Sequence, residues 1–177
     1  MSGALEALYA GDVEGAGRLL PADAELTVFE AAAFGRNKRL REILASDPAQ
    51  ANALSLDGFS ALHLAIFGGQ EEAARILIDA GADVDRVSEG SIARVPPLGT
   101  AAFVRSVRLA RLLLDAGADA DARGEGGFTA LHAAAQNGDE ELIRELLARN
   151  ADREATTRDG SRAIDLATTD EVRRLLV

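Results

Sequence analysis

His63 and His132 are the residues of this sequence best suited to acid–base or metal chemistry, and they are its only histidines. Each ends the same short pattern, with Ser60 or Thr129 three positions earlier. The pattern belongs to a repeating unit, and the two copies stand two units apart. Packed helix layers are about 10 Å deep, so the two imidazoles lie about 20 Å apart and cannot share one metal or one catalytic centre. We therefore predict buried structural imidazoles that bond to the backbone and join adjacent turns.

Two other patterns point to turns rather than to ligand sites. Gly124-Glu125-Gly126-Gly127 is glycine-rich like a phosphate loop, but no Lys-Ser/Thr pair follows it and no strand precedes it. The pairs Asp83/Asp85 and Asp119/Asp121 lack the spaced oxygen ligands and closing Glu of a calcium loop, so we expect solvated turn residues. The sequence also lacks cysteine, which removes disulfides and cysteine nucleophiles. No catalytic residue, metal ligand or cofactor is predicted.

Composition narrows the class of partner. The net charge of −10 argues against nucleic acid and anionic membranes, because both favour basic surfaces. The 47% apolar content is typical of a globular chain. The first residues show no signal peptide, and no apolar run approaches the roughly 20 residues of a membrane span. We expect a cytoplasmic protein.

The elements that position the histidines are clearest between Asp57 and Asp85. A turn at Asp57-Gly58 is followed by a helix over 60–67, a Gly-Gly break, a helix over 70–80 and a Gly stop. Apolar residues recur three and four positions apart, which predicts one buried stripe on each helix. Two helices this short cannot bury those stripes alone, so the unit needs neighbours of the same shape.

The unit recurs along the whole chain. Its copies begin at Gly3, Val28, Ala61, Pro97, Ala130 and Ala163. Four residues after each of these positions stands an alanine: Ala7, Ala32, Ala65, Ala101, Ala134 and Ala167. Sixteen residues after the first five stands a leucine: Leu19, Leu44, Leu77, Leu113 and Leu146. Both columns predict close helix packing between stacked layers.

These copies resemble the ankyrin-repeat family. Most steps are 33 residues, and residues 60–65 and 129–134 are similar to its Thr-Pro-Leu-His-x-Ala signature, with a degenerate copy at 97–101. Gly81, Gly117 and Asn150 stand where helices of the family end in a left-handed residue. The longer joint over 86–96 is expected to form an extended hairpin finger.

The resemblance implies an all-α ankyrin-repeat solenoid, built from helix–turn–helix units with β-hairpin turns. It would have about five repeats plus a short C-terminal cap in a single domain over 1–177. The expected boundaries are 2–24 for an N-terminal cap, then 25–55, 56–89, 90–125 and 126–158, with 159–177 as the C-terminal cap.

Charges alternate in sign at one position of the second helix, eleven residues into each unit: Glu14, Arg39, Glu72, Arg108 and Glu141. The alternation predicts a ladder of ion pairs between neighbouring units, each contributing about 0–1 kcal/mol; the alternative is coincidence. Arg36 and Arg105 stand where a helix-breaking glycine is usual.

The aromatic residues carry the best functional signal. Tyr9, Phe34, Phe67 and Phe103 fall six residues into their units, and Phe59 and Phe128 fall two residues before theirs. In ankyrin-like proteins these positions line a concave groove that faces a partner, so the resemblance implies a row of rings along it. Arg36, Arg94 and Arg105 border this row and could pair with acidic groups of a partner. The alternative is that the rings stack on one another and are mostly buried.

We therefore predict a non-catalytic adaptor, scaffold or inhibitor that binds an unidentified protein through a preformed groove and fingers. We expect a monomer without nucleic-acid or membrane partners. Two alternatives stay open: a structural role by self-association, and an enzyme or small-molecule binder.

Overall fold

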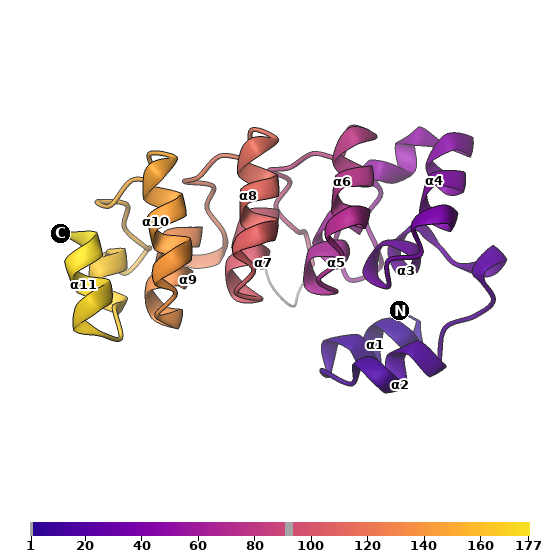
Figure 1. Ribbon diagram of the computed structural model, residues 1–177, viewed down its shortest axis with the longest axis horizontal. Helices are drawn as coiled ribbons and strands as arrows, with labels where there is room; N and C mark the ends of the chain where they lie inside the picture. Colours follow the sequence, from indigo (N-terminus) through magenta and orange to yellow (C-terminus); the bar gives the residue numbers. More distant parts are fainter. Residues whose placement is uncertain (1, 91–93) are drawn as a thin grey trace. The chain divides into compact units, whose positions relative to one another are not determined.

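The computed structural model describes residues 2–90 and 94–177, and in these ranges the chain folds into pairs of short helices (Figure 1). Residues 91–93, in the middle of the long joint expected to form a finger, lie outside the described residues. The helices are α1 (Gly3–Tyr9), α2 (Val13–Arg18), α3 (Val28–Ala33), α4 (Asn37–Ser46), α5 (Ala61–Phe67), α6 (Glu71–Asp79), α7 (Pro97–Phe103), α8 (Val107–Asp115), α9 (Ala130–Asn137), α10 (Glu140–Ala148) and α11 (Asp170–Leu176). Short 3₁₀ turns occupy Asp23–Glu25, Pro48–Asn52, Glu125–Gly127 and Ala163–Leu166.

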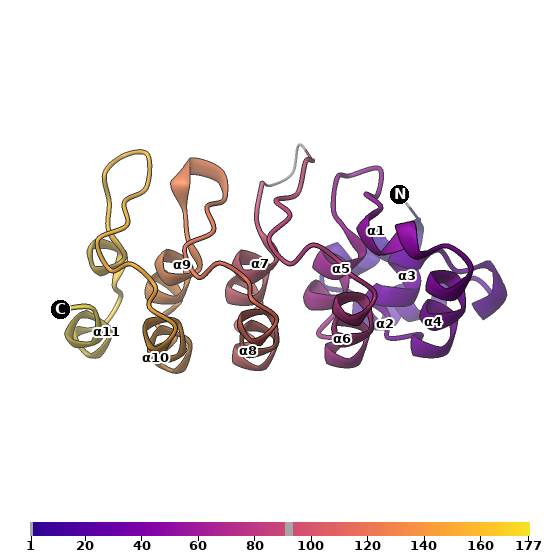
Figure 2. The ribbon, with the colours of Figure 1, turned by 90° about the horizontal axis from the view of Figure 1, so that it is seen from above.

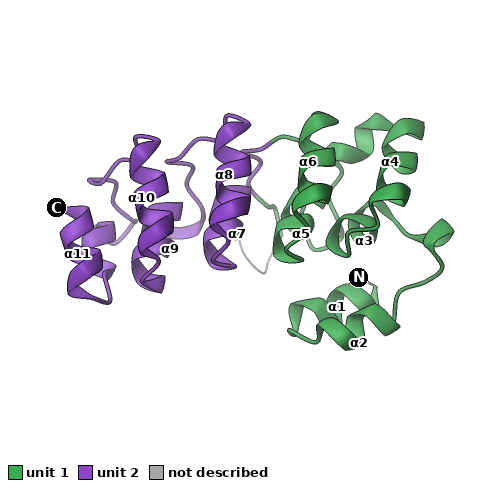
Figure 3. Ribbon diagram, in the orientation of Figure 1, with its two compact units in different colours: residues 1–83, 88–92 green, residues 84–87, 93–177 purple. Residues whose placement is uncertain are grey.

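The chain forms two compact units (Figure 3). Unit 1 holds residues 1–83 and 88–92, with helices α1 to α6. Unit 2 holds residues 84–87 and 93–177, with helices α7 to α11. In each unit, first helices pack on first helices, as α3 on α5 and α7 on α9, and second helices pack on second helices, as α4 on α6 and α8 on α10. The predicted stack of helix pairs is confirmed.

Helix starts follow from local capping. Ser60 caps α5 and Thr27 caps α3, each with a hydroxyl that accepts the N–H three residues on. Glu30 returns the contact to the Thr27 N–H at 3.0 Å, which completes a capping box. Gly81, Gly117 and Asn150 have φ values of 85°, 91° and 63°. Left-handed residues end these helices as the sequence predicts.

Both packing columns hold in most repeats and fail at the amino terminus. The alanines of the first column are buried in α3, α5, α7 and α9, and the leucines of the second column are buried in α4, α6, α8 and α10. Leu19, by contrast, is 59% exposed. The prediction that Leu19 packs like the other leucines is wrong, because α1 and α2 do not stack as a normal repeat.

Helix α3 of the second repeat is one residue shorter than the corresponding helices α5 and α7. Helix α3 ends at Ala33, and Gly35 is the left-handed residue with φ 62°, whereas Arg36 has φ −77° and precedes α4. In the next repeat α5 ends at Phe67 and the left-handed residue is Gly69. Arg36 therefore does not replace a glycine. Phe34 caps the end of α3 and is not equivalent to Phe67.

The charged column does not form the predicted pairs from Glu14 through Arg39 to Glu72. Glu14 pairs with Arg18 on the same helix, and Arg39 lies 3.7 Å from Glu42 on the same helix. Pairs between repeats use arginines two or three residues further along: the Arg41 guanidinium binds Glu72 at 2.6 Å and that of Arg111 binds Glu141 at 3.2 Å. The alternating charges correctly predict ion pairs between second helices of neighbouring repeats, but the arginines that form them are Arg41 and Arg111.

The loops between helix pairs, which we call fingers, are joined by main-chain hydrogen bonds within each unit. The Glu89 N–H donates to Gly58 O at 2.9 Å in unit 1, and the Arg158 N–H donates to Gly126 O at 2.6 Å in unit 2. Isolated antiparallel bridges at Leu54–Ser60 and Thr156–Arg162 close two of the fingers. In Figure 2 the fingers of each unit project beyond its helices to one side.

The paired aspartates at the finger bases join successive repeats. The Asp119 N–H donates to Asp85 Oδ1 at 2.9 Å, and the Asp152 N–H donates to Asp121 Oδ1 at 2.8 Å. In unit 1 Asn52 takes the same place, since its Oδ1 accepts the Asp83 N–H at 2.8 Å. We expected solvated turn residues, whereas these side chains form the same hydrogen bond between successive repeats, which we call the finger bracket.

Replacing Asp121 by Ala should lower the free energy of unfolding by about 1–2 kcal/mol, because the Asp152 N–H loses a charged acceptor. Urea unfolding measures this as a lower midpoint at unchanged slope. Asp79→Ala, at an exposed position on α6, is the control. Equal midpoints for the two variants would show that the bracket adds nothing to stability.

Candidate functional site

Three rings of the predicted row form the centre of unit 1. The Tyr9 ring lies 5.3 Å from the Phe67 ring in an edge-on arrangement and 6.1 Å from the Phe59 ring. These spacings are typical of favourable aromatic pairs. All three residues are partly buried, because they pack against a buried cluster of Leu5, Leu8, Ala16, Ala33 and Leu64. We call the surface made by Phe34, Phe59 and Phe67 the aromatic face.

The aromatic face is covered by the chain's own amino terminus. Leu5 and Leu8 of α1 lie in one cluster with Leu64 of α5. In Figure 1 the α1–α2 hairpin lies below α3 and α5 instead of extending their row. The expected N-terminal cap at 2–24 is therefore not stacked end-on but is turned across neighbouring helices.

A hydrogen bond fixes the covering helix to the finger. The Tyr9 hydroxyl donates to Asp57 Oδ2 at 2.8 Å, and the Ser55 hydroxyl donates to the other oxygen of the same carboxylate. Burial raises the pKa of the Tyr9 phenol well above its ordinary value, and the Asp57 carboxylate adds to the shift. The protonated phenol is therefore the form that the folded chain favours.

One sequence signal for this cover was missed. Leu64 is the fourth residue of α5, where α3, α7 and α9 carry the smaller Ala31, Thr100 and Ala133. Leu64 is 1% exposed because the N-terminal hairpin packs on it. A large apolar side chain at this one repeat indicates that something additional lies on its surface. The prediction of a single buried stripe is accordingly wrong for α5, where residues 61–66 are all buried.

Unit 2 exposes its ring. Phe103 ends α7 and has 70% of its surface exposed. The equivalent position on the adjacent helix α9 holds the exposed polar Gln136. Phe128 is half-buried and lies 5.4 Å from the His132 ring. The predicted row therefore divides into a covered part in unit 1 and an exposed residue in unit 2.

The three bordering arginines have different surroundings. Arg36 is exposed but lies 3.9 Å from Asp23. Arg94 is also exposed, and its carbonyl accepts the Glu125 N–H at 2.6 Å. Within the described residues, the side chains of Arg94 and Arg105 form no salt bridge.

Arg105 occupies a backbone position that favours glycine. Its φ is 56°, and Gly69 and Gly138 hold the matching positions with φ 69°. A bulky residue at positive φ is strained, and such strain is found preferentially at functional sites. Arg105 lies two residues beyond the exposed Phe103, which makes this corner of unit 2 a candidate binding surface.

The histidines are buried in structural roles. His132 Nδ1 lies 2.8 Å from the Thr129 hydroxyl, and its Nε2 lies 3.1 Å from the Ser161 carbonyl of the next finger. His63 Nδ1 makes the same contact with Ser60 at 2.8 Å. Burial lowers the pKa of His132, so its imidazole is neutral at neutral pH. Nδ1 then accepts from the Thr129 N–H while Nε2–H donates to the carbonyl.

The described residues contain no group of three or more histidine, aspartate or glutamate side chains that could hold a metal ion. No helix in the described ranges is long and apolar enough to cross a membrane.

Stacked helix pairs, fingers tied by main-chain bonds and buried histidines that join turns define a helical-repeat protein. The family model for ankyrin repeats matches residues 4–88 and 96–177. The chain belongs to the ankyrin-repeat family, whose members generally mediate protein–protein interaction. A search of curated proteins finds no match to this chain.

Tyr9→Phe should lower stability at pH 7 by about 1 kcal/mol, because it removes the hydrogen bond to Asp57. The raised phenol pKa stabilises the fold below the unfolded value of about 10, and this contribution falls as pH rises above it. Urea unfolding of both proteins at pH 7 and above pH 10 should show the difference shrinking. A difference that does not depend on pH would contradict this account.

Arg105→Gly should raise stability by about 0.5–1 kcal/mol, because glycine adopts positive φ without strain. Asn150→Gly, at φ 63°, is the matched control and should gain less, because asparagine tolerates this conformation. Thermal unfolding compares the two. Destabilisation by Arg105→Gly would mean that the arginine side chain supports the fold.

Proposed function

We propose that this protein is a non-catalytic module that binds a partner protein, as an adaptor, scaffold or inhibitor. The observation that carries the proposal is Phe103, an aromatic side chain 70% exposed at the end of α7. Large exposed aromatics are costly in water and are favoured anchors of protein interfaces. The ankyrin-repeat family is typically an interaction module, which supports the same conclusion.

Two exposed arginines of unit 2 favour a partner with acidic groups. Arg105 holds a strained backbone two residues away, and Arg94 is exposed on a finger of the same unit. Guanidinium groups bind carboxylates in a two-pronged geometry. On a chain of net charge −10, exposed arginines in the same unit as an exposed ring would select the docking orientation.

The surface is preorganised. The fingers of unit 2 are tied by main-chain hydrogen bonds from Glu125 to Arg94 and from Arg158 to Gly126, both at 2.6 Å. Little backbone order then has to be gained on binding, which removes part of the usual cost of association. A cytoplasmic location and a monomeric state stay predictions.

Phe103→Ala should reduce recovery of bound partners about ten-fold or more, as loss of an interface anchor does. The measurement is affinity capture by the purified chain from an extract of its source cells, quantified by mass spectrometry. Leu19→Ala removes an exposed apolar side chain from another surface and is the matched control.

Circular dichroism should be unchanged in Phe103→Ala, because the side chain is exposed. Recovery of the same partners by wild type and both variants would mean that Phe103 is not the anchor.

A further inference from the structure

The N-terminal hairpin buries fewer apolar side chains than the helix pairs of unit 2 do. Its helix α1 buries Ala4, Leu5 and Leu8, and α2 buries only Ala16. The second helices of unit 2, α8 and α10, each bury at least three apolar side chains. The outer surface of the hairpin leaves Val13 66% and Leu19 59% exposed. The hairpin thus contacts the other helices of unit 1 through one face of α1 and through Ala16 of α2.

That face is one short pattern. Leu5 and Leu8 are three residues apart, and Tyr9 follows directly. The two leucines enter the cluster with Leu64, while Tyr9 contacts the rings of Phe59 and Phe67 and donates to Asp57. The aromatic face therefore binds an amphipathic helix with a Leu-x-x-Leu-Tyr pattern, and the Asp57 carboxylate accepts a hydrogen bond from the tyrosine hydroxyl.

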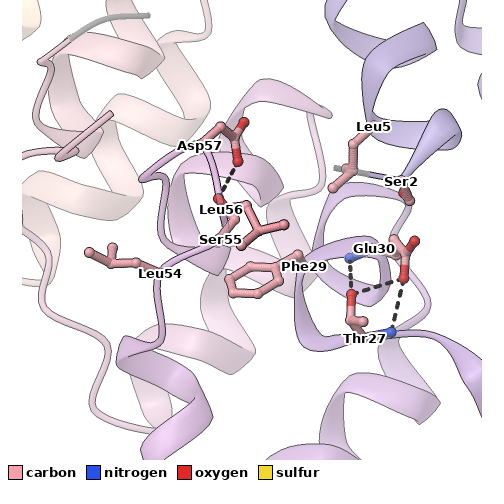
Figure 4. Close-up of a pocket in the computed structure, with 9 residues that line it drawn as sticks. All are labelled: Ser2, Leu5, Thr27, Phe29, Glu30, Leu54, Ser55, Leu56 and Asp57. Atoms are coloured by element: carbon pink, nitrogen blue, oxygen red, sulfur yellow. Dashed lines mark hydrogen bonds between the residues drawn. The ribbon is translucent and has the colours of Figure 1, made fainter. Parts of the chain in front are cut away.

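The cover fits its site incompletely. A solvent-open pocket of about 330 Å³ lies between α1, the start of α3 and the first finger (Figure 4). Its apolar lining includes Leu5, Phe29 and Leu56, and Leu56 is 94% exposed. The pocket opens to solvent, so the contact between α1 and the first finger is not closed at this edge.

The connection allows the hairpin to leave without disturbing the stack. Between α2 and α3, the segment from residue 19 to residue 27 contains only the 3₁₀ turn Asp23–Glu25. Helix α3 begins at its own capping box, formed by Thr27 and Glu30, so its start does not need α2.

We propose that the aromatic face of unit 1 is a binding site for a short amphipathic helix, occupied by α1 and open to a partner helix of the same Leu-x-x-Leu-Tyr pattern when α1 is released. The proposal rests on the proposed function, because it adds a second, covered surface to a partner-binding module. A tethered helix acts at an effective concentration of roughly millimolar, so the cover excludes weak competitors.

The probe is a synthetic peptide of residues 2–20 with a fluorophore at its amino terminus, and binding is read by fluorescence anisotropy. The receptors are the full-length wild type, Leu8→Asp and Leu19→Asp. Leu8→Asp places a charge in the buried contact and releases the cover, whereas Leu19→Asp makes the same change at an exposed position of the same hairpin.

The peptide should bind the Leu8→Asp chain about ten-fold or more tightly than the other two chains, because only that chain has lost its tethered competitor. A peptide carrying Leu8→Asp should bind none of them. Equal binding to all three chains would overturn the proposal, as would no binding to a Leu8→Asp chain that keeps the helix content of α3 to α11. Loss of all helix in Leu8→Asp would also overturn it, because the hairpin would then be integral to the fold.

Hydrogen exchange of the wild type gives a test without substitution. Amides of α1 and α2 should exchange about ten-fold or more faster than those of α5, because the cover opens on its own. Equal protection would contradict a releasable cover. These results do not depend on capture through Phe103, so the proposed function and the cover fail separately.

Discussion

The fold depends on the inability of a short helix pair to bury its own apolar surface. Helix α5 shows the constraint directly, since its first six residues are all buried and need neighbours on every side. Repeats on either side of a pair supply those neighbours, and alanines such as Ala32 and Ala65 let the backbones approach closely. Buried histidines and finger brackets then fix the spacing, because their polar atoms have partners only at the correct separation.

The same constraint makes the two ends of the chain different from its middle. At the carboxyl end, the last repeat shortens its first helix to the 3₁₀ turn Ala163–Leu166 and closes with α11. At the amino end, α1 and α2 do not satisfy the pattern of buried positions that a stacked repeat requires. Leu19 stays exposed, while Leu5 and Leu8 find apolar partners on the aromatic face. The rings and the apolar side of α1 are thus buried together, because each surface shields the other from water.

Period and signature predicted the repeats and the left-handed helix ends, because these depend on contacts that recur in every copy. The N-terminal cover could not be predicted from recurrence, since it is formed once. Register errors have the same origin. A single missing residue in α3 moves Phe34 to a capping position and gives the left-handed conformation to Gly35 rather than Arg36. The predicted pairs of Arg39 with Glu14 and Glu72 failed because long arginine side chains reach several acids, so one column does not fix their partners.

Exposure then separates the aromatic residues into two physical classes. Tyr9, Phe59 and Phe67 already have ring partners, so a competitor gains only the difference between its contacts and those it replaces. Phe103 keeps most of its surface in water, so a partner that covers it gains most of the burial free energy. A helix directed to the aromatic face must therefore first displace α1. The physical basis of this difference is a single large side chain, Leu64, which gives α1 a surface to bind that the other repeats lack.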